Sequence, residues 1–164
     1  MEPISVVTVD MIINGRPQQY EVEARQSLAD FLRDQVGILG THIGCEHGVC
    51  GACTVLMDGV PVRSCLSLAV SASGHEIVTI EGVKDLPLGQ RLQQEFLEHH
   101  ALQCGFCTPG ILTTMAHFVA HYPKATEEEI RDALSGNLCR CTGYHNIIAA
   151  VSAVISSRHD DAKR

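Results

Sequence analysis

The chain begins with a pattern of short apolar segments that predicts β-structure. Residues 5–13 are apolar with partial alternation, and Tyr20 and Val22 alternate with polar neighbours. The pair Asn14-Gly15 stands between these two runs. Such a pair is a strong signal for a two-residue hairpin turn, because both residue types accept a positive φ. We therefore predict a β-hairpin at the start of the chain.

The following segments predict a short helix and more strands. Ser27 can cap a short helix in which the apolar residues Leu28, Phe31 and Leu32 recur at i, i+3 and i+4, and this pattern stops at Gly37. Asp58-Gly59 is a second hairpin signal. The remaining strand signals lie at residues 54–57, 60–63 and 76–80. The first half is therefore expected to be a small mixed sheet with at least one helix.

Beyond Gly82 the pattern changes to helical periodicity. Four helices are expected, in the segments that start near Leu88, Thr108, Thr126 and Gly143. Thr126 and Glu129 have the spacing of a capping box, which indicates a helix start. Gly82 and Pro87 punctuate the polar connector between the halves. We predict an α+β protein with two domains, residues 1–81 and 82–164.

Composition restricts the classes of partner and the cellular compartment. The net charge is −7, and the chain has no run of Lys or Arg, which argues against nucleic acid and against anionic membranes. No stretch approaches the roughly 20 apolar residues that span a bilayer. The first residues lack the basic and apolar regions of a secretion signal, so a cytoplasmic location is expected. In a reducing cytoplasm the eight cysteines are better explained as metal ligands than as disulfides.

The first four cysteines have the spacing of a [2Fe–2S] site. Cys45, Cys50 and Cys53 form C-x4-C-x2-C in a glycine-rich loop, and Cys65 follows on the far arm of the second predicted hairpin. This is a plant-type ferredoxin arrangement, with a shorter last spacer. A zinc site fits less well, because zinc usually takes paired C-x2-4-C knuckles. His47 forms half of a Rieske-like motif with Cys45, but no Cys-x-x-His partner follows.

The other four cysteines lie in the helical half. They form Cys104-x2-Cys107 and Cys139-x-Cys141, and each pair precedes a predicted helix. Two helix N-termini that face each other would direct N–H groups and positive dipole ends at an anionic cluster. We expect the helical core to shield this cluster, whereas water can approach the first. Cys104-x2-Cys107 alone could be a redox dithiol or half of a zinc knuckle, and Cys139-x-Cys141 alone is a weaker signal. The division of all eight cysteines into two sets of four favours two clusters.

Taken together, these motifs identify a family resemblance. GCEHGVCGACTVLMDG, Arg63-Ser64-Cys65, QCGFCTPG and NLCRCTGY resemble the small iron–sulfur subunit of the molybdenum hydroxylase (xanthine oxidase) family, over roughly residues 5–157. The resemblance implies an N-terminal β-grasp ferredoxin-like domain and a C-terminal four-helix [2Fe–2S]-binding domain. It also implies a large molybdopterin-binding subunit and a medium FAD-binding subunit as partners, in a dimer of heterotrimers.

The resemblance also implies an electron route and a contact to the molybdenum cofactor. Electrons from substrate oxidation at molybdenum would pass through the C-terminal cluster and then the ferredoxin-type cluster to FAD. Gln103 is similar to the residue that contacts the pterin of the molybdenum cofactor. Substrate chemistry would take place on the large subunit and not on this chain. The alternative functions are a free-standing two-cluster electron carrier and an enzyme that uses Cys104 and Cys107 as a redox dithiol.

Overall fold

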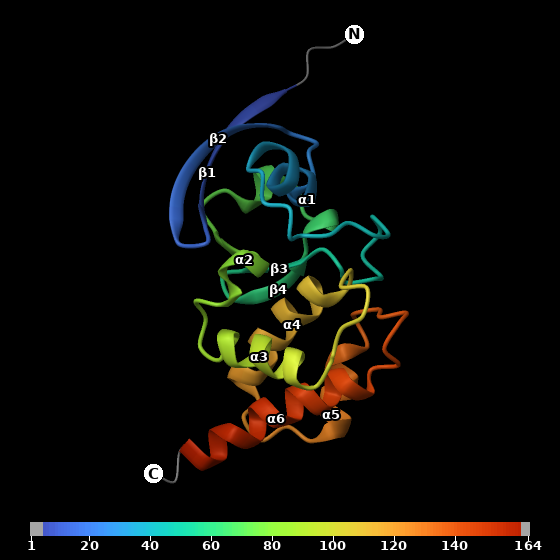
Figure 1. The fold of residues 1–164 in the computed structure, drawn as a ribbon. Helices are drawn as coiled ribbons and strands as arrows, with labels where there is room; N and C mark the ends of the chain where they lie inside the picture. The colour runs from blue at the N-terminus through green and yellow to red at the C-terminus, as the bar shows by residue number, and fades with distance from the viewer. Residues whose placement is uncertain (1–4, 162–164) are drawn as a thin grey trace.

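The computed structural model describes residues 5–161, in which a sheet-containing half is stacked on a helical half (Figure 1). The strands of the first half are β1 (Val6–Ile13), β2 (Arg16–Glu23), β3 (Thr54–Met57), β4 (Val60–Arg63) and β5 (Glu76–Val78). The helices are α1 (Leu28–Asp30), α2 (Ile80–Val83), α3 (Gly89–Glu98), α4 (Thr108–His121), α5 (Glu127–Leu134) and α6 (His145–Asp161). A π-helical turn extends α1 over Phe31–Gln35, and 3-10 turns occupy Ser64–Leu66 and Ala69–Ala72.

The five strands of the described residues form one mixed sheet in the order β2-β1-β5-β3-β4. Both predicted hairpins are confirmed: β1 pairs with β2, and β3 pairs with β4, in antiparallel register. Asn14 and Gly15 turn the first hairpin with φ values of 49° and 75°, as their sequence predicts. β5 lies between β1 and β3 and runs parallel to β1. It ends at Val78, earlier than predicted, because Thr79 begins the turn into α2.

The helix α1 packs on the inner face of this sheet. The Ser27 hydroxyl accepts a hydrogen bond from the Asp30 N–H at 3.0 Å, which confirms the predicted N-cap. Leu28, Phe31 and Leu32 are buried against the sheet, and they share their core with residues of β1, β3 and β5. A helix laid across a mixed sheet in this way is the expected β-grasp arrangement. The loop between the π-helical turn and β3 contains Cys45, Cys50 and Cys53.

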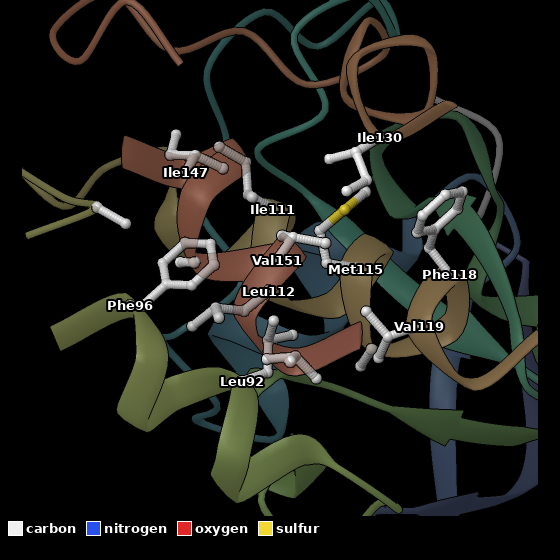
Figure 2. Packing of buried hydrophobic residues seen from close by; sticks show 14 of the residues in the cluster. Leu92, Phe96, Ile111, Leu112, Met115, Phe118, Val119, Ile130, Ile147 and Val151 are labelled. Atoms are coloured by element: carbon white, nitrogen blue, oxygen red, sulfur yellow. The ribbon is translucent and has the colours of Figure 1, made fainter. Parts of the chain in front are cut away.

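All four helices predicted for the second half are present. The capping box of Thr126 and Glu129 opens α5, with the Thr126 N–H 2.7 Å from the Glu129 carboxylate. Figure 2 shows the core between these helices, where aliphatic and aromatic side chains interdigitate. Its labelled members are Leu92, Phe96, Ile111, Leu112, Met115, Phe118, Val119, Ile130, Ile147 and Val151. Over residues 5–161, no helix is long and apolar enough to cross a membrane.

The two halves meet where α4 lies against β3 (Figure 1). Gly110, in the first turn of α4, has no room for a side chain, since a Cβ there would lie 2.2 Å from the Gly51 carbonyl oxygen. The start of α4 therefore touches the first cysteine loop backbone to backbone. The predicted division after residue 81 falls within α2, and it stays a prediction.

Candidate iron–sulfur centres

The fold brings the first four cysteines together at one end of the sheet. Cys45, Cys50 and Cys53 belong to the loop before β3, and Cys65 lies in the 3-10 turn that follows β4. The sequence placed Cys65 on the arm of the hairpin, whereas the structure places it one turn beyond. Ser64 makes this possible, because its N–H and its hydroxyl both donate to the Cys53 carbonyl, at 3.3 and 2.7 Å. Cys65 is thereby held beside Cys53.

The loop needs glycine and left-handed residues to wrap around a cluster. Glu46, Gly48 and Gly51 have φ values of 57°, 84° and 75°, which reverse the chain repeatedly. A Cβ on Gly44 would lie 3.2 Å from the Cys50 Sγ, so the bare backbone leaves room at the sulfur. The Cys50 N–H points at the Cys45 Sγ at 3.5 Å. Backbone N–H groups directed at sulfur stabilise thiolate charge and tune the potential of a cluster.

The thiols of this loop differ in their proton affinity. Hydrogen bonds from the backbone N–H groups of His47 and Cys50 lower the pKa of Cys45 to about 6. Burial, together with the neighbouring Cys53, raises the pKa of Cys65 to about 11. The loop therefore favours a thiolate at Cys45. Cys65 requires the positive charge of iron to ionise at neutral pH.

The second set of cysteines lies at the N-termini of α4 and α6, as predicted. Cys107 is the N-cap of α4, and Cys139 and Cys141 lie in the connection between α5 and α6. The Sγ atoms of Cys104 and Cys141 are 3.5 Å apart, although 37 positions separate them in the sequence. Burial, followed by the proximity of Cys139, raises the pKa of Cys107 to about 12.

Hydrogen bonds also lower the pKa values of two thiols in the second set. The backbone N–H of Phe106 lowers the pKa of Cys104. Burial raises the pKa of Cys139, but hydrogen bonds from Thr142 outweigh burial and leave it lowered. The Thr142 hydroxyl lies 3.1 Å from the Cys139 Sγ. The site thus supplies the donors that an anionic cluster needs.

One expectation about the second set is wrong. The helical core was predicted to shield these cysteines, yet Cys104 and Cys141 are exposed, and so is Gln103. The reason is that the helix N-termini lie at the end of the bundle and not within its hydrophobic core, to which none of the exposed cysteines belongs. In the first set, by contrast, Cys53 is buried. The exposed side of the second set is a surface at the end of the helical half.

Both sets of thiols fit a two-iron cluster. In each half, the fold gathers four sulfur donors from two separate segments, and each thiol influences the proton affinity of others in its own set. Among the side chains of residues 5–158, no three His, Cys, Asp or Glu residues are grouped so that they could hold a single metal ion. A [2Fe–2S] cluster spreads its four protein thiolates over two irons, so it does not require such an arrangement.

Sequence reasoning missed the residues that join the two cysteine sets. Asn137 is buried between the halves, and Arg63 and Tyr144 hydrogen bond around it. The His42 ring stacks on Phe106 with centroids 4.9 Å apart, and its Nδ1 lies 2.8 Å from the Phe106 carbonyl oxygen. A lone Asn two residues before Cys139 carries no periodic signal in the sequence. Its burial depends on contacts across the two halves.

Comparison with known proteins agrees with this architecture. Residues 11–76 match the family model of a 2Fe-2S iron-sulfur cluster binding domain, and residues 79–152 match that of a [2Fe-2S] binding domain. Each half therefore corresponds to one cluster-binding domain, and the chain binds two [2Fe–2S] clusters.

The relatives are similar over nearly their whole length. The gamma subunit of caffeine dehydrogenase from Pseudomonas sp. (strain CBB1) is 53% identical over 150 residues, covering 89% of each chain. The small subunit of nicotine 6-hydroxylase from Paenarthrobacter nicotinovorans is 52% identical over 149 residues, covering 91% of this chain and 90% of the relative.

One solved structure is similar to this chain in both fold and sequence. A chain of quinoline 2-oxidoreductase from Pseudomonas putida 86 superposes with a TM-score of 0.87 at 49% identity, covering 94% of this chain and 97% of that one. With two cluster-binding domains in this order and relatives of this similarity, the chain belongs to the small iron–sulfur subunits of the molybdenum hydroxylase family.

Proposed function

We propose that this chain carries electrons from a molybdopterin site on a large partner subunit, through its two clusters, to FAD on a medium partner subunit. The observation that carries this proposal is the pair of four-thiol sites in one chain, of which one has an exposed side. A chain of two clusters can connect two cofactors that lie on different proteins. The subunit itself performs no substrate chemistry, and it acts as part of an oxidoreductase.

The assignment of ligands follows the two sets. Cys45, Cys50, Cys53 and Cys65 would hold the cluster nearer FAD, and Cys104, Cys107, Cys139 and Cys141 the cluster nearer molybdenum. When bound, each cluster supplies one-electron redox chemistry. The cysteines and their N–H donors hold the clusters and adjust their potentials through hydrogen bonds to sulfur.

The exposed side of the second set supports its contact with the molybdenum subunit. Leu102, Phe106 and Leu138 are exposed apolar side chains next to its cysteines in the sequence. Apolar side chains around an exposed cluster site fit a surface that a partner covers. Gln103 lies beside Cys104 on this exposed segment, where its side-chain amide could hydrogen bond to a pterin ring. We therefore assign Gln103 as the pterin contact.

The first set has a similar apolar border, which we assign to the flavoprotein. Val49 and Leu66 are exposed next to Cys50 and Cys65. A free-standing carrier would need only one exposed cluster, and the relatives are named as subunits, which favours an assembled complex. The full assembly would be a dimer of heterotrimers in the cytoplasm. Size-exclusion chromatography with mass measurement, on protein isolated from its source cells, tests this assembly.

The cluster assignment is tested by spectroscopy on the purified complex. The chain should contribute about four iron and four sulfide, and reduction with dithionite should give two distinct S = 1/2 EPR signals. Cys50→Ser should alter only one of these signals, and Cys139→Ser only the other. Either variant should slow reduction of FAD by substrate while leaving substrate binding intact. A single signal that integrates to one spin per chain would contradict the proposal.

A further inference from the structure

The two ligand loops are joined by hydrogen bonds between their backbones. The Leu138 N–H, next to Cys139 in the second set, donates to the carbonyl of Cys50 in the first set at 2.8 Å. The adjacent Gly51 carbonyl accepts from the Asn137 side-chain amide Nδ2 at 3.1 Å. Two consecutive carbonyls of one ligand loop are thus bound by two consecutive residues of the other.

Asn137 is the centre of this junction. It is only 1% exposed, and every polar group on it has a partner. Its side-chain Oδ1 accepts from the Thr114 hydroxyl of α4 at 3.1 Å, and its backbone N–H donates to Leu134 at 2.9 Å. Its carbonyl accepts from the Tyr144 hydroxyl at 3.0 Å. The same Tyr144 oxygen accepts from the Cys139 N–H at 2.8 Å, so the junction extends to a ligand of the second set.

The surrounding backbone leaves no freedom for the loops to shift. Gly51 has a φ of +75°, and a Cβ on it would lie 2.4 Å from the Gly136 carbonyl oxygen. Arg63 reaches from β4 to the same Gly136 carbonyl, with Nη2 at 2.6 Å. Backbones in direct contact around a buried, fully bonded amide form a rigid connection, because any sliding would break several hydrogen bonds at once.

From these contacts we infer that Asn137 is a positioning residue that fixes the two cluster sites relative to each other. This inference rests on the proposed function. The distance and orientation between the clusters are then set within this chain and do not depend on the partner subunits. The hydrogen bonds of Asn137 go to Gly51, Thr114, Leu134 and Tyr144 and to no cysteine sulfur, so it acts through the ligand loops. Electron transfer between the sites moves one electron from the reduced to the oxidised cluster, without proton or bond changes, so its rate depends on this geometry.

The test compares variants of the assembled complex. Asn137→Ala removes the amide, and Asn137→Asp replaces the Nδ2 donor with an oxygen that repels the Gly51 carbonyl. Asn146→Ala is the matched control, because the exposed Asn146 amide also donates to a backbone carbonyl, that of His100 at 3.3 Å, but within the helical half. Iron content, the two EPR signals and their mutual magnetic splitting at low temperature are measured after full reduction.

The expected result is that both Asn137 variants keep their iron and both signals but lose the splitting, whereas the control keeps all three. Unchanged splitting in the two Asn137 variants would overturn the inference. If the Asn137 variants lose iron, the splitting is measured in Thr114→Val instead. This substitution removes only the hydroxyl that donates to the Asn137 Oδ1. Altered splitting in that variant at full iron content supports the inference. Unchanged splitting in Thr114→Val refutes the inference. Loss of iron in Thr114→Val also refutes it, because Asn137 would then support cluster binding itself. Absence of two signals in the wild type would instead refute the proposed function.

Discussion

Gly110→Ala tests the contact between the start of α4 and the first ligand loop. In an isolated helix, replacing glycine with alanine stabilises the helix by about 1 kcal/mol, because alanine has the higher helix propensity. Here the new methyl would lie 2.2 Å from the Gly51 carbonyl oxygen and 3.0 Å from the Ala52 Cα. Both neighbours are backbone atoms, which cannot rotate away. The contact therefore predicts the opposite sign from helix propensity.

The magnitude follows from what must move. Overpacking against a rigid wall costs about 1–3 kcal/mol. The Gly51 carbonyl also accepts from the Thr54 N–H at 3.2 Å, the Thr54 hydroxyl at 2.6 Å and the Asn137 amide at 3.1 Å. Loss of one of these bonds adds about 1 kcal/mol. After subtraction of the propensity gain, we expect a net loss of about 2 kcal/mol, which lowers the unfolding midpoint by roughly 4–8 °C for a protein of this size.

The assay is thermal unfolding of the cluster-containing protein, followed by visible absorbance and far-ultraviolet circular dichroism. Gly59→Ala serves as the control, since its Cβ would meet nothing within 4 Å and only its φ of +80° is unfavourable. That strain alone costs about 1 kcal/mol, so the control should show a smaller shift. A Gly110→Ala midpoint equal to or above that of the wild type would refute the reasoning, because propensity would then outweigh the contact.

Three further outcomes are expected. Thr126→Ala should lower stability by about 1 kcal/mol through loss of the capping box, with unchanged EPR signals; changed signals would mean that α5 influences the clusters. Met115→Ala, in the fully buried helical core, should cost about 2–5 kcal/mol in chemical unfolding, and a loss below 1 kcal/mol would contradict tight packing there. In iron-free protein that remains folded by circular dichroism, Cys45 should be alkylated at pH 7 far faster than Cys107, because pKa values of about 6 and about 12 make only Cys45 largely thiolate. Peptide mass mapping measures this difference, which should shrink as the pH falls below 6; equal rates at pH 7 would contradict it.

Local signals were sufficient to predict most elements of this protein from its sequence. Asn14-Gly15 and Asp58-Gly59 turn hairpins because both positions of each pair have positive φ, which is a property of the residues themselves. Ser27 and Thr126 cap helices through hydrogen bonds three residues away. The cysteine spacings likewise reflect the local requirement of a loop that wraps a cluster. In each case the physical cause lies within a few residues of the signal.

Tertiary structure alone decided how the two halves meet and which side of each site is exposed. The sequence placed the second cysteine set at helix starts but could not tell that Cys104 and Cys141 would remain exposed, because exposure depends on where the bundle ends. It also could not distinguish Asn137 from any polar loop residue. Asn137 becomes buried only when Gly51 and Thr114, which are 86 and 23 positions away, close around its amide. Contacts between segments so distant in the chain depend on the packing of the whole fold, which no local pattern encodes.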